Sequence, residues 1–369
     1  MANWVTAMSV IGTIAILYGG GQIPTANQVI SDFTEQLLRK GYKVYGVHKS
    51  FLGLGNINCY EELDILKAMN ITKEPGTYLS TCRKVDPASD KWFENILKTL
   101  KSMDIHTILL PGGDGSSRAA VDLVKRVQAA GYFLQIIFVP CTIDGIPNSD
   151  TMGIEPAVCE TLRHVILMTV NAIATWNPKY ILPRIPIIEI QGRNRNDIAV
   201  EVLNRIINNG KIGQFQLDDI NLILIPTAYE WSFGKLLKQI YEDGRPTVIL
   251  IAEGAKPVEK YWNAFVGNGS GEKLQNLINA DGERETNFDK VGYLSQTNDS
   301  NPSSEIIKIK NWAEYTVEAM AMTRKSIAVI KNGADFSTMN LEDFAKATDS
   351  DEGIPLSDET VKNLINYLP

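Results

Sequence analysis

The chain has 369 residues, of which 44% are hydrophobic and 21% charged, and its formal net charge is −7. This is the composition of a soluble globular protein that is long enough for two domains. An acidic chain does not offer a general surface for nucleic acid, so anionic ligands would have to be bound by a few well-placed arginines.

The cysteines and histidines are few and scattered. The four cysteines show no paired metal spacing, which favours a reducing compartment and makes the cytoplasm the expected location. His48, His106 and His164 lie in no ligand-like cluster, so a histidine metal site is not expected.

The first apolar segment runs from Val5 to Tyr18. It is interrupted by small polar residues and is too short to span a bilayer, so we expect no membrane partner and interpret residues 11–17 as a strand. That strand runs into Gly19-Gly20-Gly21, and a helical pattern follows through Leu38. Backbone N–H groups of such a turn can meet a phosphate, although the turn is neither a P-loop nor a dinucleotide fingerprint.

A second glycine turn, Gly112-Gly113-Asp114-Gly115-Ser116, follows the apolar run from Thr107 to Leu110. The helical pattern that begins there, to Ala130, predicts a helix whose unpaired N–H groups favour phosphate. A carboxylate in such a place makes sense if Asp114 shares a Mg²⁺ ion with the ligand. The alternative, that Asp114 only caps the helix, is equally open from this segment alone.

A third strand, Leu134 to Val139, is followed by Thr142 and Asp144. Strands that alternate with helices in this way predict a parallel sheet covered on both faces, and ligands bind at the carboxyl ends of such strands. Asp144 is therefore placed to act as a general base or a second metal ligand. A polar turn without function is the alternative.

A second series of helices and strands begins near Ile154. A long helix to about Ala174 precedes a strand from Ile185 to Ile190, which ends in Gln191-Gly192-Arg193, and a later strand ends in Glu253. The other expected segments are strands at 222–225, 247–251, 290–294 and 327–330, a surface connection at 267–282, a helix at 305–324 and a last short helix after the acidic loop 349–353.

This ordered set of motifs resembles the ATP-dependent 6-phosphofructokinase family over roughly residues 11–330. The family's first turn is similar to Gly20-Gly21-Gln22-Ile23-Pro24-Thr25-Ala26-Asn27, and its Gly-Gly-Asp-Gly-Ser is unaltered at 112–116. Its Pro-Gly-Thr-Ile-Asp resembles Pro140-Cys141-Thr142-Ile143-Asp144. Its Arg-Ile-x-x-x-Glu-x-Met-Gly-Arg is matched by Arg184-Ile185, Glu189 and Gln191-Gly192-Arg193, and further matches are Phe51 to Leu54, Arg83, Glu253 and Arg284-Glu285-Thr286.

The resemblance implies an α/β fold with two Rossmann-like three-layer αβα domains of the phosphofructokinase type. Residues 1–152 with about 296–345 would form a nucleotide-binding domain, and residues 153–295 with about 346–369 an acceptor-substrate domain. The resemblance also implies a cytoplasmic kinase of glycolysis that assembles as a homo-oligomer, either a dimer or a homotetramer. A hetero-oligomer with a relative is the alternative.

The resemblance implies ATP and Mg²⁺ as cofactors and a small sugar or sugar phosphate as the substrate. Asp144 would take the proton from the attacking hydroxyl, with Thr142 and Arg193 beside it, and Asp114 would hold the metal. The residues implied in nucleotide binding are Gly21, Arg83, Gly112, Gly113, Asp114, Gly115 and Ser116. Those implied in acceptor binding are Thr142, Arg184, Gln191, Gly192, Arg193, Glu253, Tyr293 and Gln296, with Arg184 reaching across a subunit interface. The reaction would be in-line transfer of the γ-phosphoryl group.

Two positions bear on the phosphoryl donor. Gly115 stands where pyrophosphate-dependent relatives have a second Asp, whose bulk and charge would disfavour the α-phosphate of ATP. Cys141 stands where those relatives have a Lys. The sequence therefore favours ATP over pyrophosphate.

The chain departs from the family at the acceptor pocket. Tyr293, Gln296 and Asn287 replace a His and two Arg residues that would hold a sugar 6-phosphate, and only Arg184 of that set remains. Each lost charged hydrogen bond costs roughly 1.5–3 kcal/mol. Gln22 and Gln191 also replace the family's Asp and Met, and the second Asp of Thr-Ile-Asp-Asn-Asp is missing.

Three interpretations follow. The first is an ATP-dependent phosphotransferase that acts on another sugar, polyol or nucleoside-like acceptor. The second is an authentic 6-phosphofructokinase in which residues such as Arg195 or Lys290 replace the lost phosphate ligands. The third is a catalytically weak or regulatory subunit that binds nucleotide and assembles with an active relative.

Overall fold

The computed structural model describes residues 11–82, 85–147, 149–174, 184–193, 195–259, 262, 267, 269–282, 284–292, 294, 301–348 and 356–369. The chain divides into two compact units. The first consists of Met1–Thr142, Ile146–Gly153 and Thr297–Asp349, and the second of Ile143–Gly145, Ile154–Gln296 and Ser350–Pro369. The segment around Asp144 therefore belongs to the second unit, although the residues on both sides of it belong to the first.

The first unit is built on a seven-stranded sheet with the order β13-β12-β5-β4-β1-β2-β3. The central strands are parallel, and each edge strand is antiparallel to its neighbour. The strands are β1 (Thr13–Ile16), β2 (Lys43–Val47), β3 (Tyr60–Leu63), β4 (Ile105–Gly112), β5 (Gln135–Pro140), β12 (Ile327–Asn332) and β13 (Asp335–Asn340). The strand order reverses between β1 and β4, and ligands of such sheets bind at this point.

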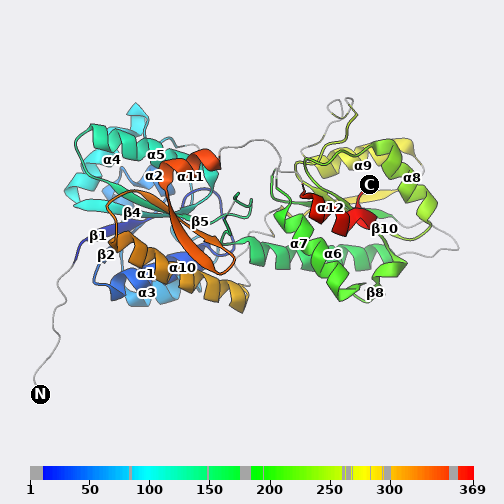
Figure 1. The fold of residues 1–369 in the computed structure, drawn as a ribbon, viewed down its shortest axis with the longest axis horizontal. Helices are drawn as coiled ribbons and strands as arrows, with labels where there is room; N and C mark the ends of the chain where they lie inside the picture. Colours follow the sequence, from blue (N-terminus) through cyan, green and yellow to red (C-terminus); the bar gives the residue numbers. More distant parts are fainter. Residues whose placement is uncertain are drawn as a thin grey trace, which may run out of the picture. The chain divides into compact units, whose positions relative to one another are not determined.

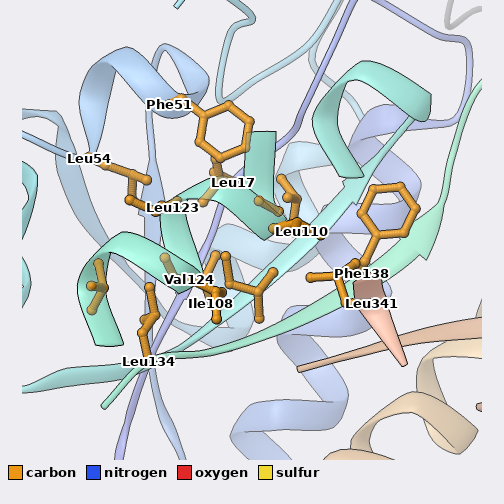
Figure 2. Close-up of a cluster of buried hydrophobic side chains, with 14 of the residues drawn as sticks. Leu17, Phe51, Leu54, Ile108, Leu110, Leu123, Val124, Leu134, Phe138 and Leu341 are labelled. Atoms are coloured by element: carbon orange, nitrogen blue, oxygen red, sulfur yellow. The ribbon is translucent and has the colours of Figure 1, made fainter. Parts of the chain in front are cut away.

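Helices cover both faces of this sheet (Figure 1). On one face lie α1 (Ala26–Arg39), α3 (Ile65–Ile71) and α10 (Ser303–Ala321), and on the other α4 (Asp90–Ser102), α5 (Asp114–Ala129) and α11 (Leu341–Ala347). The short α2 (Ser50–Gly53) follows β2. Figure 2 shows Leu110 and Phe138 of the sheet beside Leu123 and Val124 of α5, and all four side chains are buried. The apolar strands are continuous because both of their faces are covered.

The second unit contains a four-stranded sheet with the order β11-β6-β10-β9, and all its strands are parallel. The strands are β6 (Ile185–Ile190), β9 (Asn221–Ile225), β10 (Thr247–Ala252) and β11 (Thr286–Lys290), and a short hairpin joins β7 (Lys211–Ile212) to β8 (Phe215–Gln216). The helices are α6 (Ile154–Ala174), α7 (Asp197–Asn209), α8 (Phe233–Asp243), α9 (Ser270–Asp281) and α12 (Asp358–Leu364). Buried side chains of α8 and α9 pack on one face of the sheet.

The expected α/β fold with parallel sheets is confirmed, but two segments differ from expectation. Residues 267–282 were predicted as a surface connection, whereas Ser270 to Asp281 form α9. Its buried residues Leu274, Leu277 and Ile278 have helical spacing, which the many Gly and Asn residues around them obscured. The strand predicted at 290–294 lies earlier, at Thr286–Lys290, because this polar edge strand has no apolar run to reveal it.

The buried carboxyl of Asp32 makes stability depend on pH. This α1 side chain is 5% exposed and accepts a hydrogen bond from Gln28 Nε2 at 2.9 Å. Burial raises its pKa from 3.8 to about 6, against the opposing effects of Gln28 and Lys310. A raised pKa means that ionisation is disfavoured in the folded state, so stability falls as the pH rises from about 4 to about 6 and stays lower above that range.

We therefore expect Asp32→Asn to stabilise the protein above pH 7 by about 1–3 kcal/mol and to lose this advantage as the pH falls towards 4. Urea unfolding at pH 5 and pH 8 measures the difference. Asp122→Asn, at an exposed position of α5, is the control and should change little at either pH. Equal effects of Asp32→Asn at both pH values would contradict the assignment.

Candidate active site

The two glycine turns meet at the carboxyl ends of β1 and β4. These strands are parallel neighbours, and Gly19 N donates to Pro111 O at 2.8 Å. A Cβ on Gly19 would lie 2.6 Å from Ser116 Oγ, and a Cβ on Gly112 would lie 2.9 Å from Ser116 Cβ. The buried Ser116 side chain therefore fills the space that the two glycines leave. The turns form one continuous cradle of backbone.

Helix α5 begins within this cradle. Gly113 precedes it, and Asp114, half-buried, is its first residue. Gly115 is exposed, and a Cβ there would meet nothing within 4 Å. A cradle of backbone at a helix N-terminus suits phosphate groups, and one carboxylate beside them suits Mg²⁺, which keeps several waters and takes few protein ligands. Among the described residues no three His, Cys, Asp or Glu side chains form a metal cluster, so phosphate oxygens would have to complete the coordination.

The close approach of Gly19 to Ser116 can be tested by adding one methyl group. Gly19→Ala should destabilise the protein by about 1–3 kcal/mol through overpacking, because the two turns would have to separate, and should weaken the nucleotide binding that the family resemblance implies. Gly115→Ala, which adds the same methyl group to open space, is the matched control. Thermal unfolding and equilibrium titration with MgATP would measure both effects. Unchanged stability and binding in Gly19→Ala would refute the tight packing.

Thr142 joins the same cradle from the end of β5. Cys141 N donates to Gly112 O at 2.8 Å, and a Cβ on Gly113 would lie 3.4 Å from Thr142 Oγ1. Thr151 holds Thr142 in place, because its hydroxyl accepts from Thr142 N and donates to Thr142 O, both at 3.0 Å. Thr142 is thus brought beside the Gly112–Ser116 turn.

Asp144 belongs to the second unit and pairs with Arg193. Arg193 Nε lies 3.3 Å from Asp144 Oδ2, and the Asp144 side chain is 29% exposed. The next residue, Gly145, has a φ of +69°, and a Cβ there would lie 2.5 Å from Asp197 Oδ2 at the start of α7. The contact with Asp197 and the positive φ explain why a glycine follows the aspartate in this chain.

Arg193 and Glu253 meet because they follow the neighbouring parallel strands β6 and β10. Arg193 N donates to Glu253 Oε2 at 3.2 Å. Arg193 has a φ of +50°, an uncommon conformation for a residue with a side chain. Its backbone therefore contacts Glu253, while its guanidinium contacts Asp144. Gln191 is half-buried and Gly192 buried in the same turn.

Lys290 and Glu189 are close to these residues. Lys290 Nζ lies 2.6 Å from Glu189 Oε1 and 3.4 Å from Glu253 Oε1. Glu189 is fully buried, and its other oxygen accepts from Gly271 N at 2.8 Å. Burial lowers the pKa of Lys290, but the two carboxylates outweigh this effect and raise it. From the sequence, Glu189 was indicated only by its motif match and Lys290 only as a possible phosphate ligand, and neither indicated that the two side chains pair.

Arg184 lies at the other end of β6. It precedes the strand that Gln191 follows, so about 20 Å of extended chain separate it from the Arg193 turn. Its Nε donates to Glu285 at 2.8 Å, and both side chains are exposed, at 65% and 76%. Within one chain, Arg184 therefore does not contact the Asp144, Arg193 and Glu253 cluster. Arg83, Tyr293 and Gln296 lie outside the described residues.

Comparison with known proteins identifies relatives of this chain. The family model described as phosphofructokinase matches residues 13–320. The ATP-dependent 6-phosphofructokinase of Clostridium botulinum (strain Hall) is 29% identical over 264 residues, which is 69% of this chain and 74% of that protein. The Enterococcus faecalis protein of the same name is 30% identical over 191 residues, which is 51% of this chain and 55% of that protein.

Solved structures share the fold. Phosphofructokinase from Saccharomyces cerevisiae superposes with a TM-score of 0.71 at 17% identity, over 96% of this chain and 46% of the yeast chain. This chain therefore spans less than half the length of the yeast chain. A pyrophosphate-dependent phosphofructokinase from Nitrosospira multiformis has a TM-score of 0.74 at 13% identity, over 99% of this chain and 93% of that one.

Proposed function

This chain belongs to the phosphofructokinase family, and on that basis we propose that it transfers the γ-phosphoryl group of ATP to a hydroxyl of a sugar or sugar-like acceptor. The first unit would bind the nucleotide and the second the acceptor. The observation that carries the proposal is the pairing of Asp144 with Arg193, which in turn contacts Glu253. A carboxylate held beside acceptor-binding groups is what a general base for a hydroxyl requires.

Gly21 and the residues from Gly112 to Ser116 would hold the nucleotide phosphates through their backbone N–H groups. Arg83 would add a positive charge. Asp114 would hold Mg²⁺, which neutralises charge on the transferring phosphoryl group when it is bound. The residues that would bind the acceptor are Thr142, Gln191, Gly192, Arg193, Glu253, Tyr293 and Gln296, together with Arg184.

In the transfer step, Asp144 would accept the proton of the acceptor hydroxyl as that oxygen attacks the γ-phosphorus. The bond between the γ-phosphorus and the bridging oxygen to the β-phosphate breaks, and ADP leaves. Arg193 would orient the carboxylate through its Nε. Catalysis of this kind depends mainly on alignment and charge neutralisation.

ATP as the donor is supported by Gly115, which is exposed and beside open space. In the proposed site this open space would accept the part of ATP beyond its β-phosphate, and a carboxylate at position 115 would obstruct it. The similar Clostridium botulinum protein is named as ATP-dependent, whereas the similar Nitrosospira multiformis structure is named as pyrophosphate-dependent. The overall fold therefore does not distinguish the two donors, and the proposal of ATP depends on the residue at position 115.

Authentic 6-phosphofructokinase activity is the second candidate function, and the names of the bacterial relatives favour it. Two observations weigh against the replacement of its phosphate ligands by Arg195 or Lys290. Arg195 is only 7% exposed, and Lys290 is already paired with two carboxylates. A catalytically weak or regulatory subunit is the third candidate, supported by the loss of the family's arginines.

Assembly as a homo-oligomer is supported by two features. Arg184 lies away from the Arg193 cluster of its own chain, so an acceptor would reach it from another subunit. Helix α6 also carries an exposed apolar surface, in which Leu167 is 56% exposed beside Leu294 at 47%. Within the described ranges, α6 alone is long and apolar enough to cross a membrane by length and composition. A helix that packs on a sheet, as α6 does on β6, meets the same criterion.

The proposal is tested by measuring ADP release from MgATP with fructose 6-phosphate and with a panel of phosphorylated and unphosphorylated sugars and polyols. Asp144→Asn serves as the blank. Turnover of an unphosphorylated acceptor alone supports the first function, and efficient turnover of fructose 6-phosphate supports the second. MgATP binding without turnover of any acceptor would support the third function, a regulatory subunit.

A further inference from the structure

Lys290 lies between two carboxylates of different character. Its Nζ is 2.6 Å from Glu189, which is fully buried, and 3.4 Å from Glu253, which is 32% exposed. The buried carboxylate cannot lose its cation without a large desolvation cost. Lys290 is therefore held in place by the buried Glu189. Its second contact, with Glu253, involves a partly exposed carboxylate that a ligand can reach.

Hydrogen bonds hold the backbone of Glu253 in place, so Lys290 can affect only the orientation of its side chain. Glu253 N donates to Ile190 O at 3.0 Å, and Glu253 O accepts from Ser270 Oγ at 2.8 Å. Of the side-chain oxygens, Oε2 accepts from Arg193 N, and Oε1 faces Lys290. Among the described residues, these two contacts fix the rotation of the Glu253 carboxylate, and the bond from Arg193 N alone would let the carboxylate turn about Oε2.

The charges of this cluster also limit what can bind to it. Three carboxylates, those of Asp144, Glu189 and Glu253, face two cations, Arg193 and Lys290. Among the described residues, these five side chains have one negative charge in excess, and Lys290 cannot turn to an anionic ligand without leaving the buried Glu189 carboxylate without its cation. Neutral hydroxyl groups, which donate to carboxylates, suit this surface.

We propose that Lys290 is a positioning residue that orients the Glu253 carboxylate towards neutral hydroxyl groups of the acceptor, and that it does not bind an acceptor phosphate. The inference rests on the proposed phosphotransferase function. In this role Lys290 pairs with carboxylates of the protein, whereas a substitute phosphate ligand would pair with the acceptor. The acceptor class that follows is a polyhydroxy compound whose uncharged part contacts Glu253.

Kinetics of Lys290→Met and Lys290→Arg test this role. Lys290→Met should raise the KM of the best acceptor by about ten-fold or more, the loss expected for a charge-assisted hydrogen bond, with the KM of MgATP unchanged. Lys290→Arg should recover much of the loss. Lys256→Met, at an exposed position of the same unit, is the matched control. An unchanged acceptor KM in Lys290→Met would overturn the proposal. So would a loss confined to phosphorylated acceptors, because that is the signature of a phosphate ligand.

Lys290→Met leaves Glu189 buried without its cation and could fail to fold. The double variant Glu189→Gln with Lys290→Met removes both charges and keeps an oxygen for Gly271 N. It should fold and show the same rise in acceptor KM. Wild-type acceptor KM in the folded double variant would overturn the proposal.

A second measurement separates this proposal from the proposed function. Competitive labelling with acetic anhydride, followed by mass spectrometry, reports the reactivity of each lysine. Lys290 should react much more slowly than Lys256, and Glu253→Gln should accelerate it. The positioning role is refuted if Lys290 is acetylated as fast as Lys256, or if its acetylation rate is the same in the Glu253→Gln variant. This holds whether or not the enzyme turns over. If the labelling behaves as expected but no acceptor is phosphorylated, the proposed reaction fails while the link between Lys290 and Glu253 stands.

Discussion

Asp144→Asn is expected to lower kcat by roughly 10²–10⁴-fold, the contribution of a positioned general base. The substitution keeps the size of the side chain and an oxygen that can still accept from Arg193 Nε, which lies 3.3 Å from the native carboxylate. It removes the negative charge that pairs with Arg193 and, in the proposed mechanism, the ability to take the proton from the acceptor hydroxyl. The fold should be unaffected, because Asp144 is 29% exposed and its partner 68% exposed.

The measurement is single-turnover phosphoryl transfer from MgATP to the best acceptor, combined with a titration of MgATP binding. Binding should be unchanged, since Asp144 contributes nothing to the Gly112–Ser116 cradle in the proposed mechanism. Asp122→Asn, on the exposed side of α5, should retain full activity. A kcat for Asp144→Asn within a few-fold of wild type would mean that another group, or water, takes the proton.

Gly115→Asp is expected to reduce the affinity for MgATP by about two to three orders of magnitude. A second carboxylate beside Asp114 would lie close to the nucleotide phosphates, and two like charges about 4 Å apart repel by roughly 4 kcal/mol in a partly solvated site. The variant should fold, because a Cβ at this position meets nothing within 4 Å and an acidic residue in the first turn of a helix is favourable.

Gly115→Asn has nearly the same volume without the charge and separates repulsion from obstruction. It should lose less affinity than Gly115→Asp, in proportion to the electrostatic share of the effect. Both are measured by MgATP titration and by turnover with MgATP or magnesium pyrophosphate as the donor. Undiminished MgATP binding in Gly115→Asp would show that position 115 does not select the donor.

The regular apolar strands could be predicted from the sequence, and so could the turns that follow them. Ile185–Ile190 is a strand with the predicted bounds, because four isoleucines in six residues favour a buried strand. Arg193 contacts Glu253 because β6 and β10 are neighbours in the sheet. The order of strands in a sheet cannot be predicted from local sequence patterns. The family resemblance implied only that both residues bind the acceptor, not that Arg193 contacts Glu253.

The role of Lys290 could not be predicted from the sequence. Its contact with Glu189 requires the parallel register in which Lys290 faces Glu189 across β11 and β6, and β11 itself was misplaced. The prediction for residues 270–281 was wrong for a different reason. Their Gly and Asn content indicated a loop more strongly than the helical spacing of Leu274, Leu277 and Ile278 indicated a helix. In both cases a tertiary contact decided what local composition did not.

The packing of Ser116 between Gly19 and Gly112 has an evolutionary consequence. A methyl group on either glycine would meet the serine at less than 3 Å, and a side chain larger than serine would press on both turns. No single step to a bulkier residue at any of the three positions is therefore neutral. The three residues are almost a hundred positions apart at their extremes, yet a bulkier residue at one of them is expected to require a compensating change at another.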